Sequence, residues 1–185
     1  MGALHNDIKK VLYTEEAIAQ AVNKLGKQLS ADYAGKRPLI LGTLCGAFIF
    51  MADLVRSIEP VPADLDMDFL RISSYVGTQS SGDSTMAMQS RLPVKGRHVL
   101  VVEDIVDTGR TLKSLITSLQ QQGVASVKIV TLLNKQARRM VDIQADYVGI
   151  QCPNEFVVGY GLDFEHKYRS LPYIGILHPK CYELS

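Results

Sequence analysis

The stretch VLVVEDIVDTGRTL, residues 99–112, decides the fold. Its apolar run predicts a buried strand, which we expect to end at Glu103 and Asp104. A Thr-Gly-Arg-Thr turn follows and an apolar pattern then resumes, so the strand should lead into a helix that begins near Gly109. Glu103, Asp104 and Asp107 thus bring three carboxylates to a helix N-terminus, which is a position that favours anions.

The same alternation of strands and helices is expected along most of the chain. Thr14 can cap the first helix, and Glu15 and Glu16 suit the positive end of that helix. The pattern predicts helices at 13–33, 46–58 and 112–122, a strand within 38–44 that ends at Gly42, and strands at 98–103, 126–133 and 147–150. Alternating elements predict an α/β fold with a mainly parallel central sheet flanked by helices.

Three further segments have a less regular pattern. Residues 63–73 alternate and predict a strand with Asp64, Asp66 and Asp68 on its wetter face and Leu65, Met67 and Phe69 on the other. Residues 74–90 are rich in Ser, Gly and Thr, which is typical of a functional lid or a disordered connection. Residues 156–185 are aromatic and irregular, and we expect them to pack over one sheet edge as a small subdomain.

Composition limits the class of protein. The 185 residues suit one domain, 46% of them are hydrophobic, and 20 basic against 19 acidic side chains argue against a nucleic-acid surface. No apolar run is long enough to cross a membrane, and the first residues lack a signal-peptide core. Cys45, Cys152 and Cys181 suggest reduced thiols, so the cytoplasm is expected, although an organelle remains open if a transit peptide was removed.

The acidic turn has a chemical interpretation of its own. Ligands of open parallel sheets bind beyond the carboxyl ends of the strands. Free N–H groups at the start of the helix, with the hydroxyls of Thr108 and Thr111, would cradle a phosphate, and Gly109 would let it approach closely. The nearby carboxylates then require Mg2+ or sugar hydroxyls between them and the phosphates. The alternative to a phosphate site is an ordinary capped helix whose N-terminus carries solvated carboxylates.

The whole stretch resembles the 5-phosphoribosyl-1-pyrophosphate (PRPP) signature of type I phosphoribosyltransferases: a hydrophobic run, two acids, a variable pair and Asp-Thr-Gly-x-Thr. Four other stretches are similar to the hypoxanthine-guanine branch of this family. They are LGTLCGAFIFMADL (41–54), DFLRISSYVGTQSSGD (68–83), LLNKQA (132–137) and EFVVGYGLDFEHKYRSL (155–171).

The resemblance implies one domain over 1–185, with a core of roughly 14–150 and a C-terminal part, 151–185, that contributes a base-binding segment. A small hood subdomain would come from the chain termini. The resemblance also implies that the protein is an Mg2+-dependent pentosyltransferase of purine salvage. This enzyme would convert hypoxanthine or guanine plus PRPP to IMP or GMP plus pyrophosphate, and it would be a dimer or tetramer.

The resemblance also assigns roles to individual residues. Asp107 would be the acid/base for N7 of the purine, and Ser74 and Tyr75 would close a lid over the reaction centre. The remaining PRPP-binding residues would be Leu44, Cys45, Gly46, Glu103, Asp104, Thr108, Gly109, Arg110, Thr111 and Arg169. The purine would contact Lys135, Phe156, Val157 and Asp163, and the metal shell would include Glu103, Asp104 and Asp163.

One departure from the family and two alternatives remain. Many members have a lysine where this chain has Cys45, so pyrophosphate would be held mainly by backbone N–H groups near Cys45 and Gly46. The first alternative is a PRPP-sensing regulator that binds RNA or DNA, which would need a basic face or an added domain. The second is a sister enzyme for another base such as xanthine, which the lysine at 135 would not exclude.

Overall fold

The computed structural model describes residues 5–59, 65–71 and 90–182. The expected lid residues Ser74 and Tyr75 lie outside these ranges. The helices are α1 (Glu15–Asp32), α2 (Phe48–Arg56) and α3 (Arg110–Gln121), with 3-10 turns at Gln136–Arg138 and Pro179–Cys181. The strands are β1 (Ile8–Tyr13), β2 (Leu39–Leu44), β3 (Asp66–Arg71), β4 (His98–Val106), β5 (Ser126–Asn134), β6 (Tyr147–Gln151), β7 (Val157–Val158) and β8 (Ile174–Leu177).

A parallel sheet forms the centre of the molecule, as the sequence predicts. Within the described ranges it has five strands in the order β3-β2-β4-β5-β6, and every pair is parallel. Its central strands are apolar on both faces: Val99 and Leu100 of β4 are 0% and 1% exposed. Such strands need cover on both sides, and helices supply it.

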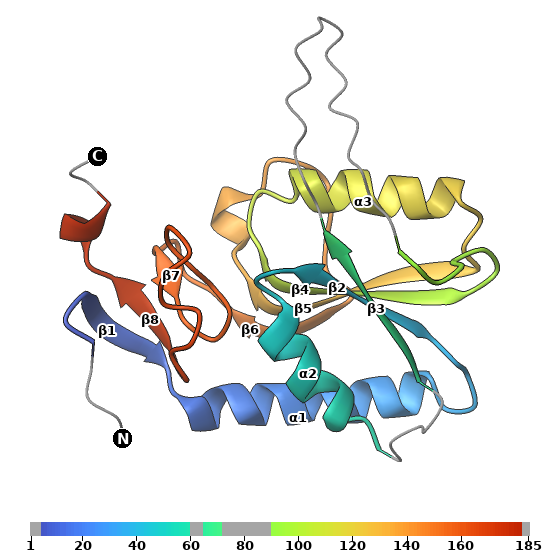
Figure 1. Cartoon of the computed structure of the whole chain (residues 1–185), viewed down its shortest axis with the longest axis horizontal. Helices are drawn as coiled ribbons and strands as arrows, with labels where there is room; N and C mark the ends of the chain where they lie inside the picture. Colours follow the sequence, from blue (N-terminus) through green and yellow to red (C-terminus); the bar gives the residue numbers. More distant parts are fainter. Residues whose placement is uncertain (1–4, 60–64, 72–89, 183–185) are drawn as a thin grey trace, which may run out of the picture.

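Helices α1 and α2 cover one face of this sheet and α3 covers the other (Figure 1). The first helix begins as expected, because the Thr14 side chain accepts a hydrogen bond from the Ala17 N–H at 3.3 Å. Its buried stripe, which includes Leu25 and Leu29, packs against β-strand residues such as Leu100. The flanked parallel sheet is therefore confirmed.

Two strands run further than the sequence indicated. We expected the strands to end at Gly42 and at Glu103–Asp104, but β2 continues to Leu44 and β4 to Val106. The β4 extension has a physical cause, since Val106 pairs with Asn134 at the end of β5 and is itself buried. The acidic pair therefore lies inside a paired strand rather than in the loop that follows it.

The chain termini form a second, antiparallel sheet that we call the terminal sheet, with strand order β1-β8-β7. Its first strand was not expected from the sequence, and the C-terminal segment is more regular than its composition indicated. Ile8, Val158 and Leu177 form its small core, with exposed fractions of 4%, 0% and 0%. Each of these strands is short, so the pairing of the two termini is what makes the sheet possible.

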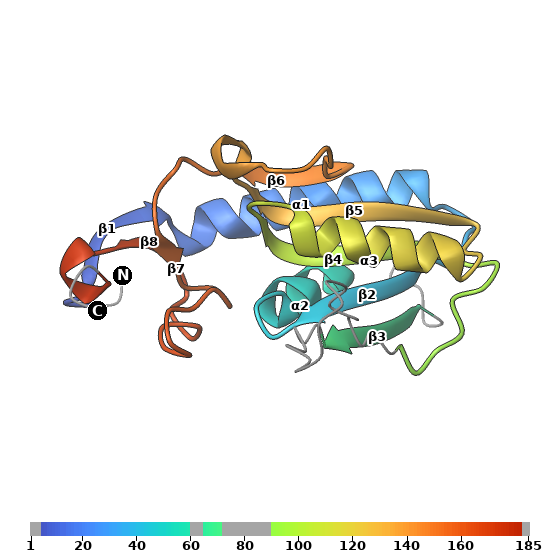
Figure 2. The ribbon, with the colours of Figure 1, turned by 90° about the horizontal axis from the view of Figure 1, so that it is seen from above.

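The terminal sheet lies at one end of the molecule, beyond the carboxyl ends of the parallel strands, rather than over a sheet edge (Figures 1 and 2). The expectation of packing over an edge is therefore wrong. The position follows from connectivity, because β1 leads through Thr14 directly into α1. Two side-chain hydrogen bonds connect the terminal part to the central part: the Tyr160 hydroxyl donates to the Asp53 carboxylate on α2 at 2.5 Å, and the Tyr13 hydroxyl of β1 donates to the Gln151 carbonyl of β6 at 2.7 Å.

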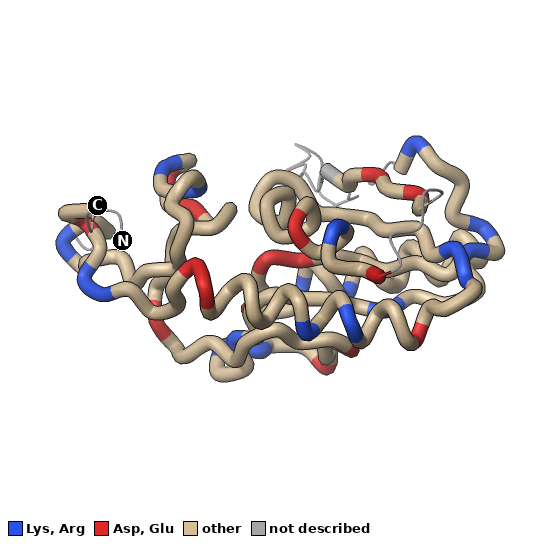
Figure 3. Tube along the Cα trace, turned by 90° about the horizontal axis from the view of Figure 1, so that it is seen from below, with Lys and Arg blue, Asp and Glu red and all other residues tan. Residues whose placement is uncertain are grey.

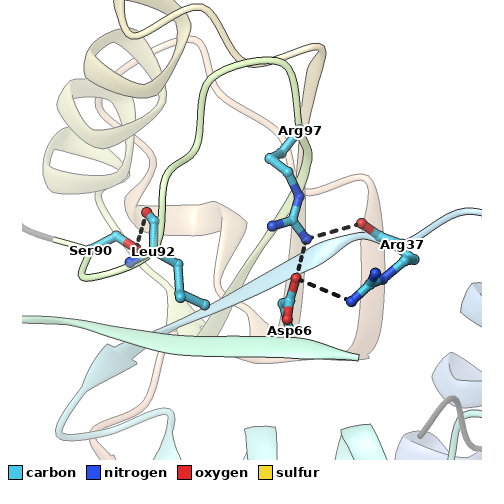
Figure 4. Close-up of polar contacts among 5 residues, drawn as sticks. All are labelled: Arg37, Asp66, Ser90, Leu92 and Arg97. Carbon is cyan, nitrogen blue, oxygen red and sulfur yellow. Dashed lines mark hydrogen bonds and ion pairs between the residues drawn. The ribbon is translucent and has the colours of Figure 1, made fainter. Parts of the chain in front are cut away.

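Strand β3 shows the reverse of its expected exposure. Met67 and Phe69 are 49% and 41% exposed, whereas the aspartates at 66 and 68 are half-buried. Asp66 accepts a bond from Arg97 at 2.8 Å and lies 3.8 Å from the Arg37 guanidinium (Figure 4). Because β3 is an edge strand, its apolar face is not covered in full, and its acids serve as anchors for the chain that leads to β4.

Charges of both signs are spread along the chain. Lys and Arg positions occur at both ends of the trace and between them, interspersed with Asp and Glu (Figure 3). In the described ranges, no helix is both long and apolar enough to span a membrane. All three cysteines are unpaired.

Candidate active site

A pocket of about 260 Å³ opens where the carboxyl ends of β2 and β4 meet the start of α3. We call it the turn pocket. Its floor is the turn at 107–111, which the sequence predicts as a phosphate cradle. The pocket is lined by Thr43, Leu44, Gly46, Glu103, Asp104, Ile105, Val106, Asp107, Thr108, Gly109, Thr111 and Leu112.

The turn has the backbone geometry of an anion site. Gly109 caps α3 with a φ of 79°, a left-handed conformation that favours glycine. A Cβ there would lie only 2.6 Å from the Ile143 side chain, so space also requires glycine. No described residue accepts a hydrogen bond from the N–H groups of 107–111. These donors remain available to a ligand at the N-terminus of a 12-residue helix.

A second pocket of about 250 Å³, the lysine pocket, adjoins the first. The two share Asp104, Ile105 and Asp107, so a ligand in one would lie beside a ligand in the other. Residues 156–163, from β7 and the loop that follows it, form the far wall of this pocket. Its lining consists of Asp104, Ile105, Asp107, Lys135, Arg138, Phe156, Val157, Leu162 and Asp163.

The acidic pair of β4 is partly buried at the wall of the turn pocket. Burial, and then the neighbouring Asp104, raises the pKa of Glu103 to about 8, although a bond from the Thr43 hydroxyl at 2.6 Å opposes this. Burial likewise raises the pKa of Asp104 to about 6, opposed by backbone hydrogen bonds and by the charge of Arg169. At neutral pH Glu103 is therefore mostly protonated and Asp104 mostly ionised, and a bound cation would favour the ionised form of both.

The loop after β2 lies against Asp104. The Leu44–Cys45 peptide bond is cis. A Cβ on Gly46 would overlap the Asp104 carboxylate, and a Cβ on Gly161 would overlap the Gly46 carbonyl. Glycine at these two positions thus lets the loop after β2 contact the Asp104 carboxylate on one side and the backbone of the loop after β7 on the other.

Asp163 and Arg169 stand next to this contact. Arg169 forms an ion pair with Asp163 at 2.7 Å and donates to the Gly161 carbonyl at 2.6 Å. Asp163 also accepts the His166 N–H at 2.9 Å. The carboxylate is therefore oriented by partners on its own loop.

Asp107 has one carboxylate oxygen without a partner. Its Oδ1 atom is buried and forms no hydrogen bond within the described structure, while Oδ2 lies 3.4 Å from the Arg138 guanidinium. Buried polar atoms are almost always satisfied, so an unsatisfied one suggests that a ligand supplies the missing bond.

The lysine pocket combines a buried cation with carboxylates and with apolar side chains. Lys135 is only 6% exposed, and its Nζ donates to the Glu155 carbonyl at 2.7 Å. An ammonium group has three donors, so it can still serve a ligand. Phe156 is 37% exposed and stacks on Tyr182 with ring centroids 5.0 Å apart. Val157 is buried in β7.

Most residues singled out in the sequence line these two pockets. Among the site residues that the structure describes, the exceptions are Cys45 and Arg110, which are exposed, and Arg169, which forms an ion pair with Asp163 of the lysine pocket. Sequence reasoning missed Thr43 and Arg138. Thr43 could have been noticed as a lone polar side chain in an apolar strand, and Arg138 by its position in the basic segment after Lys135.

The residues present fit a divalent cation that is coordinated mainly by substrate oxygens and water. Mg2+ needs only one or two protein carboxylates under those conditions. Asp104 and Asp163 both line the lysine pocket, and each has its carboxylate oriented by hydrogen bonds from protein groups. A cage made by the protein alone is absent, because no group of three candidate ligands occurs among the described residues.

The comparisons with known proteins agree with this geometry. The family profile described as a phosphoribosyl transferase domain matches residues 10–165. The chain is 52% identical to the hypoxanthine-guanine phosphoribosyltransferase of Streptococcus pneumoniae over 180 residues, which cover 97% of this chain and 98% of that protein. The chain belongs to the hypoxanthine-guanine phosphoribosyltransferase family.

Solved structures and longer relatives add detail. The crystal structure of a Staphylococcus aureus hypoxanthine phosphoribosyltransferase superposes with a TM-score of 0.87 at 47% identity, covering 96% of each chain. For the Trypanosoma cruzi enzyme the TM-score is 0.89 at 38% identity, covering 99% of this chain and 98% of that one. The bifunctional TilS/HprT protein of Listeria monocytogenes is 49% identical, and this chain spans only 28% of its length.

The raised pKa of Glu103 predicts a pH-dependent stability. Its folded pKa of about 8 exceeds the ordinary 4.5, so folding takes up a proton between these values. The free energy of unfolding should therefore fall as the pH rises from about 5.5 to about 8.5 in metal-free buffer. Glu103→Gln keeps a neutral group of similar shape and should flatten this slope.

Urea denaturation across this pH range measures the effect. Asp142→Asn, which changes an exposed carboxylate, is the matched control and should keep the parent's slope. An identical slope in Glu103→Gln and the parent would show that Glu103 is ionised in the folded state.

Proposed function

We propose that this protein transfers the 5-phosphoribosyl group of PRPP to hypoxanthine or guanine, which forms IMP or GMP and releases pyrophosphate. One observation carries the proposal: an anion cradle and a lysine pocket adjoin along Asp104, Ile105 and Asp107. A nucleotide has its phosphate and base on either side of a ribose, and the shared residues would face that ribose.

The turn pocket receives the 5-phosphate. The free N–H groups of 107–111, with the hydroxyls of Thr108 and Thr111, provide donors that suit three anionic oxygens. Arg110 at the first turn of α3 adds positive charge nearby. Glu103 and Asp104 face the ribose hydroxyls and the metal shell, where loss of their protons would be compensated by hydroxyl donors or a cation.

Pyrophosphate leaves from the side of the loop at 44–46. Leu44 and Gly46 line the turn pocket, and Cys45 lies between them. Cys45 supplies no positive charge, so binding there relies on backbone N–H groups and on Arg169. This arrangement differs from that of family members with lysine at this position.

The substrate metal is Mg2+, for which Glu103, Asp104 and Asp163 are the candidate ligands in the protein. When bound, it would neutralise pyrophosphate and make it a better leaving group. The protein's own contribution is to hold the reacting atoms in line and to stabilise positive charge on the ribose carbon as the bond breaks.

Asp107 acts as the acid/base on N7 of the purine. Its partnerless, buried Oδ1 supports this role, because a ligand N–H would satisfy it. Lys135 donates to the 6-oxo group, which hypoxanthine and guanine have and adenine lacks. Phe156 offers an aromatic surface to the base, and the backbone of Val157 and the neighbouring Asp163 recognise its edge.

Three further proposals concern the whole molecule. Residues 1–185 work as one domain, with Ser74 and Tyr75 as a lid that excludes water from the reaction centre. The protein acts in the cytoplasm, which its unpaired thiols support, and needs no nucleic-acid or membrane partner. It forms a dimer or tetramer, which is supported by exposed apolar side chains at Leu44, Phe48, Met67 and Phe69.

The activity is tested by mixing purified protein with PRPP and Mg2+ and with one base at a time. Nucleotide should form with hypoxanthine and guanine and not with adenine, while xanthine distinguishes the sister enzyme. If no nucleotide forms with either hypoxanthine or guanine, the proposal is refuted. RNA or DNA binding that depends on PRPP would favour the regulator instead.

Asp107→Asn tests the acid/base role. The amide keeps the shape of the side chain but cannot exchange the proton, so kcat should fall by about 10²–10⁴ while the KM for PRPP changes little. Steady-state kinetics measure both values. Asp142→Asn serves as the control, and a kcat equal to that of the parent would remove Asp107 from this role.

Lys135→Ala tests recognition of the 6-oxo group. Loss of a buried, charged donor should raise the KM for guanine by roughly tenfold or more and leave the KM for PRPP nearly unchanged. Lys128→Ala removes an exposed lysine of the same sheet and should have no effect. A rise confined to the KM for PRPP would show that the assignment is wrong.

A further inference from the structure

The segment after β5 lies directly behind the phosphate turn. Arg139, just beyond the 3-10 turn, donates from Nε to the Asp107 carbonyl at 3.0 Å and from Nη2 to the Val106 carbonyl at 3.1 Å. The next residue, Met140, donates its N–H to the Thr108 carbonyl at 3.0 Å. Three consecutive carbonyls of the turn are therefore bound from one side.

These bonds fix the direction of the opposite groups. In a trans peptide the C=O and the following N–H point in opposite directions. Binding the carbonyls of Val106, Asp107 and Thr108 therefore turns the N–H groups of Asp107, Thr108 and Gly109 away from Arg139. These are the N–H groups that have no acceptor within the described ranges and belong to residues that line the turn pocket.

The guanidinium is itself anchored. Its Nη2 also donates to the Asn134 side chain at 2.7 Å, and Nη1 donates to the Ile143 carbonyl. The aliphatic part of Arg139 packs beside Gly109, where a Cβ would lie 3.1 Å from its Cδ. Burial lowers the pKa of Arg139, as expected for a cation whose solvent has been replaced by protein carbonyls.

No other basic side chain could make this set of bonds. Arginine presents five donors in a rigid planar fork, whereas lysine presents three on a single nitrogen. Acceptors spread over the turn, the end of β5 and the loop at 143 require the fork. Arg139 lines neither pocket, so its effect on a ligand must be indirect.

We propose that Arg139 is a positioning residue for the 5-phosphate, which holds the carbonyls of 106 and 107 so that the N–H groups of the turn face the anion. The inference rests on the proposed assignment of the turn to the 5-phosphate. It also links the two halves of the site, because the Lys135 N–H donates to the same Val106 carbonyl at 3.0 Å.

Arg139→Lys is the test, with two ligands that differ only in the 5-phosphate. The Kd for IMP should rise about tenfold, because the N–H groups lose their orientation, and the Kd for inosine should stay within about twofold. Calorimetry or competition binding measures both. Equal weakening of IMP and inosine, or an unchanged Kd for IMP, would overturn the proposal.

Arg97→Lys is the matched control. Arg97, like Arg139, is a partly exposed arginine. It donates to the Asp66 carboxylate and to the Arg37 carbonyl (Figure 4). Arg97 lies at the amino ends of the parallel strands, far from the turn pocket. Both variants are expected to lose some thermal stability. Only Arg139→Lys should change the ratio of the two dissociation constants.

A second variant covers the case in which Arg139→Lys does not fold. Asn134→Ala keeps the guanidinium and removes one acceptor that orients it, so it should produce a smaller change of the same kind. The unaltered protein separates the two proposals. If it binds IMP and inosine equally, the assignment of the turn to the 5-phosphate fails; if it prefers IMP but neither variant reduces the preference, only the role of Arg139 fails.

Discussion

The parallel pairing of β4 with β5 is the interaction on which the site depends. It runs from His98 opposite Ser126 to Val106 opposite Asn134, and so continues past the acidic pair. Because Glu103 and Asp104 lie within this ladder, they are partly buried and their pKa values rise. The same pairing brings Lys135, the first residue after β5, to the turn that follows β4. Two segments far apart in the sequence thus become the two sides of one site.

Much of the architecture follows from local sequence patterns. The helix from Glu15, the buried strands and the glycine turn at 109 each have a signal within a few residues: a cap, an apolar run or a required backbone conformation. The parallel sheet follows from their alternation, and it is confirmed. The similarity of the acidic stretch to a known signature extended the prediction from the fold to a family, and the comparisons show the same family.

What the sequence did not predict depends on partners distant along the chain. The end of β4 is set by β5, and β1 exists because β8 pairs with it, so neither has a purely local signal. The exposure of β3 is set by its place at the sheet edge, which alternation alone cannot reveal. Thr43 and Arg138 matter because of the carboxylates they meet, Glu103 and Asp107, and those contacts exist only after folding.

The terminal sheet has a consequence for the order of folding. Ile8 pairs with Leu177, so this sheet closes a loop that contains almost the whole chain, whereas the central sheet forms through much shorter loops. Contacts of such high sequence separation are slow to form, because the chain must lose more entropy before they are made. The wall of the lysine pocket is carried by this sheet and the loop that follows β7. A chain emerging from the ribosome can therefore build its phosphate turn early, but it completes the base site only after its last strand has been synthesised.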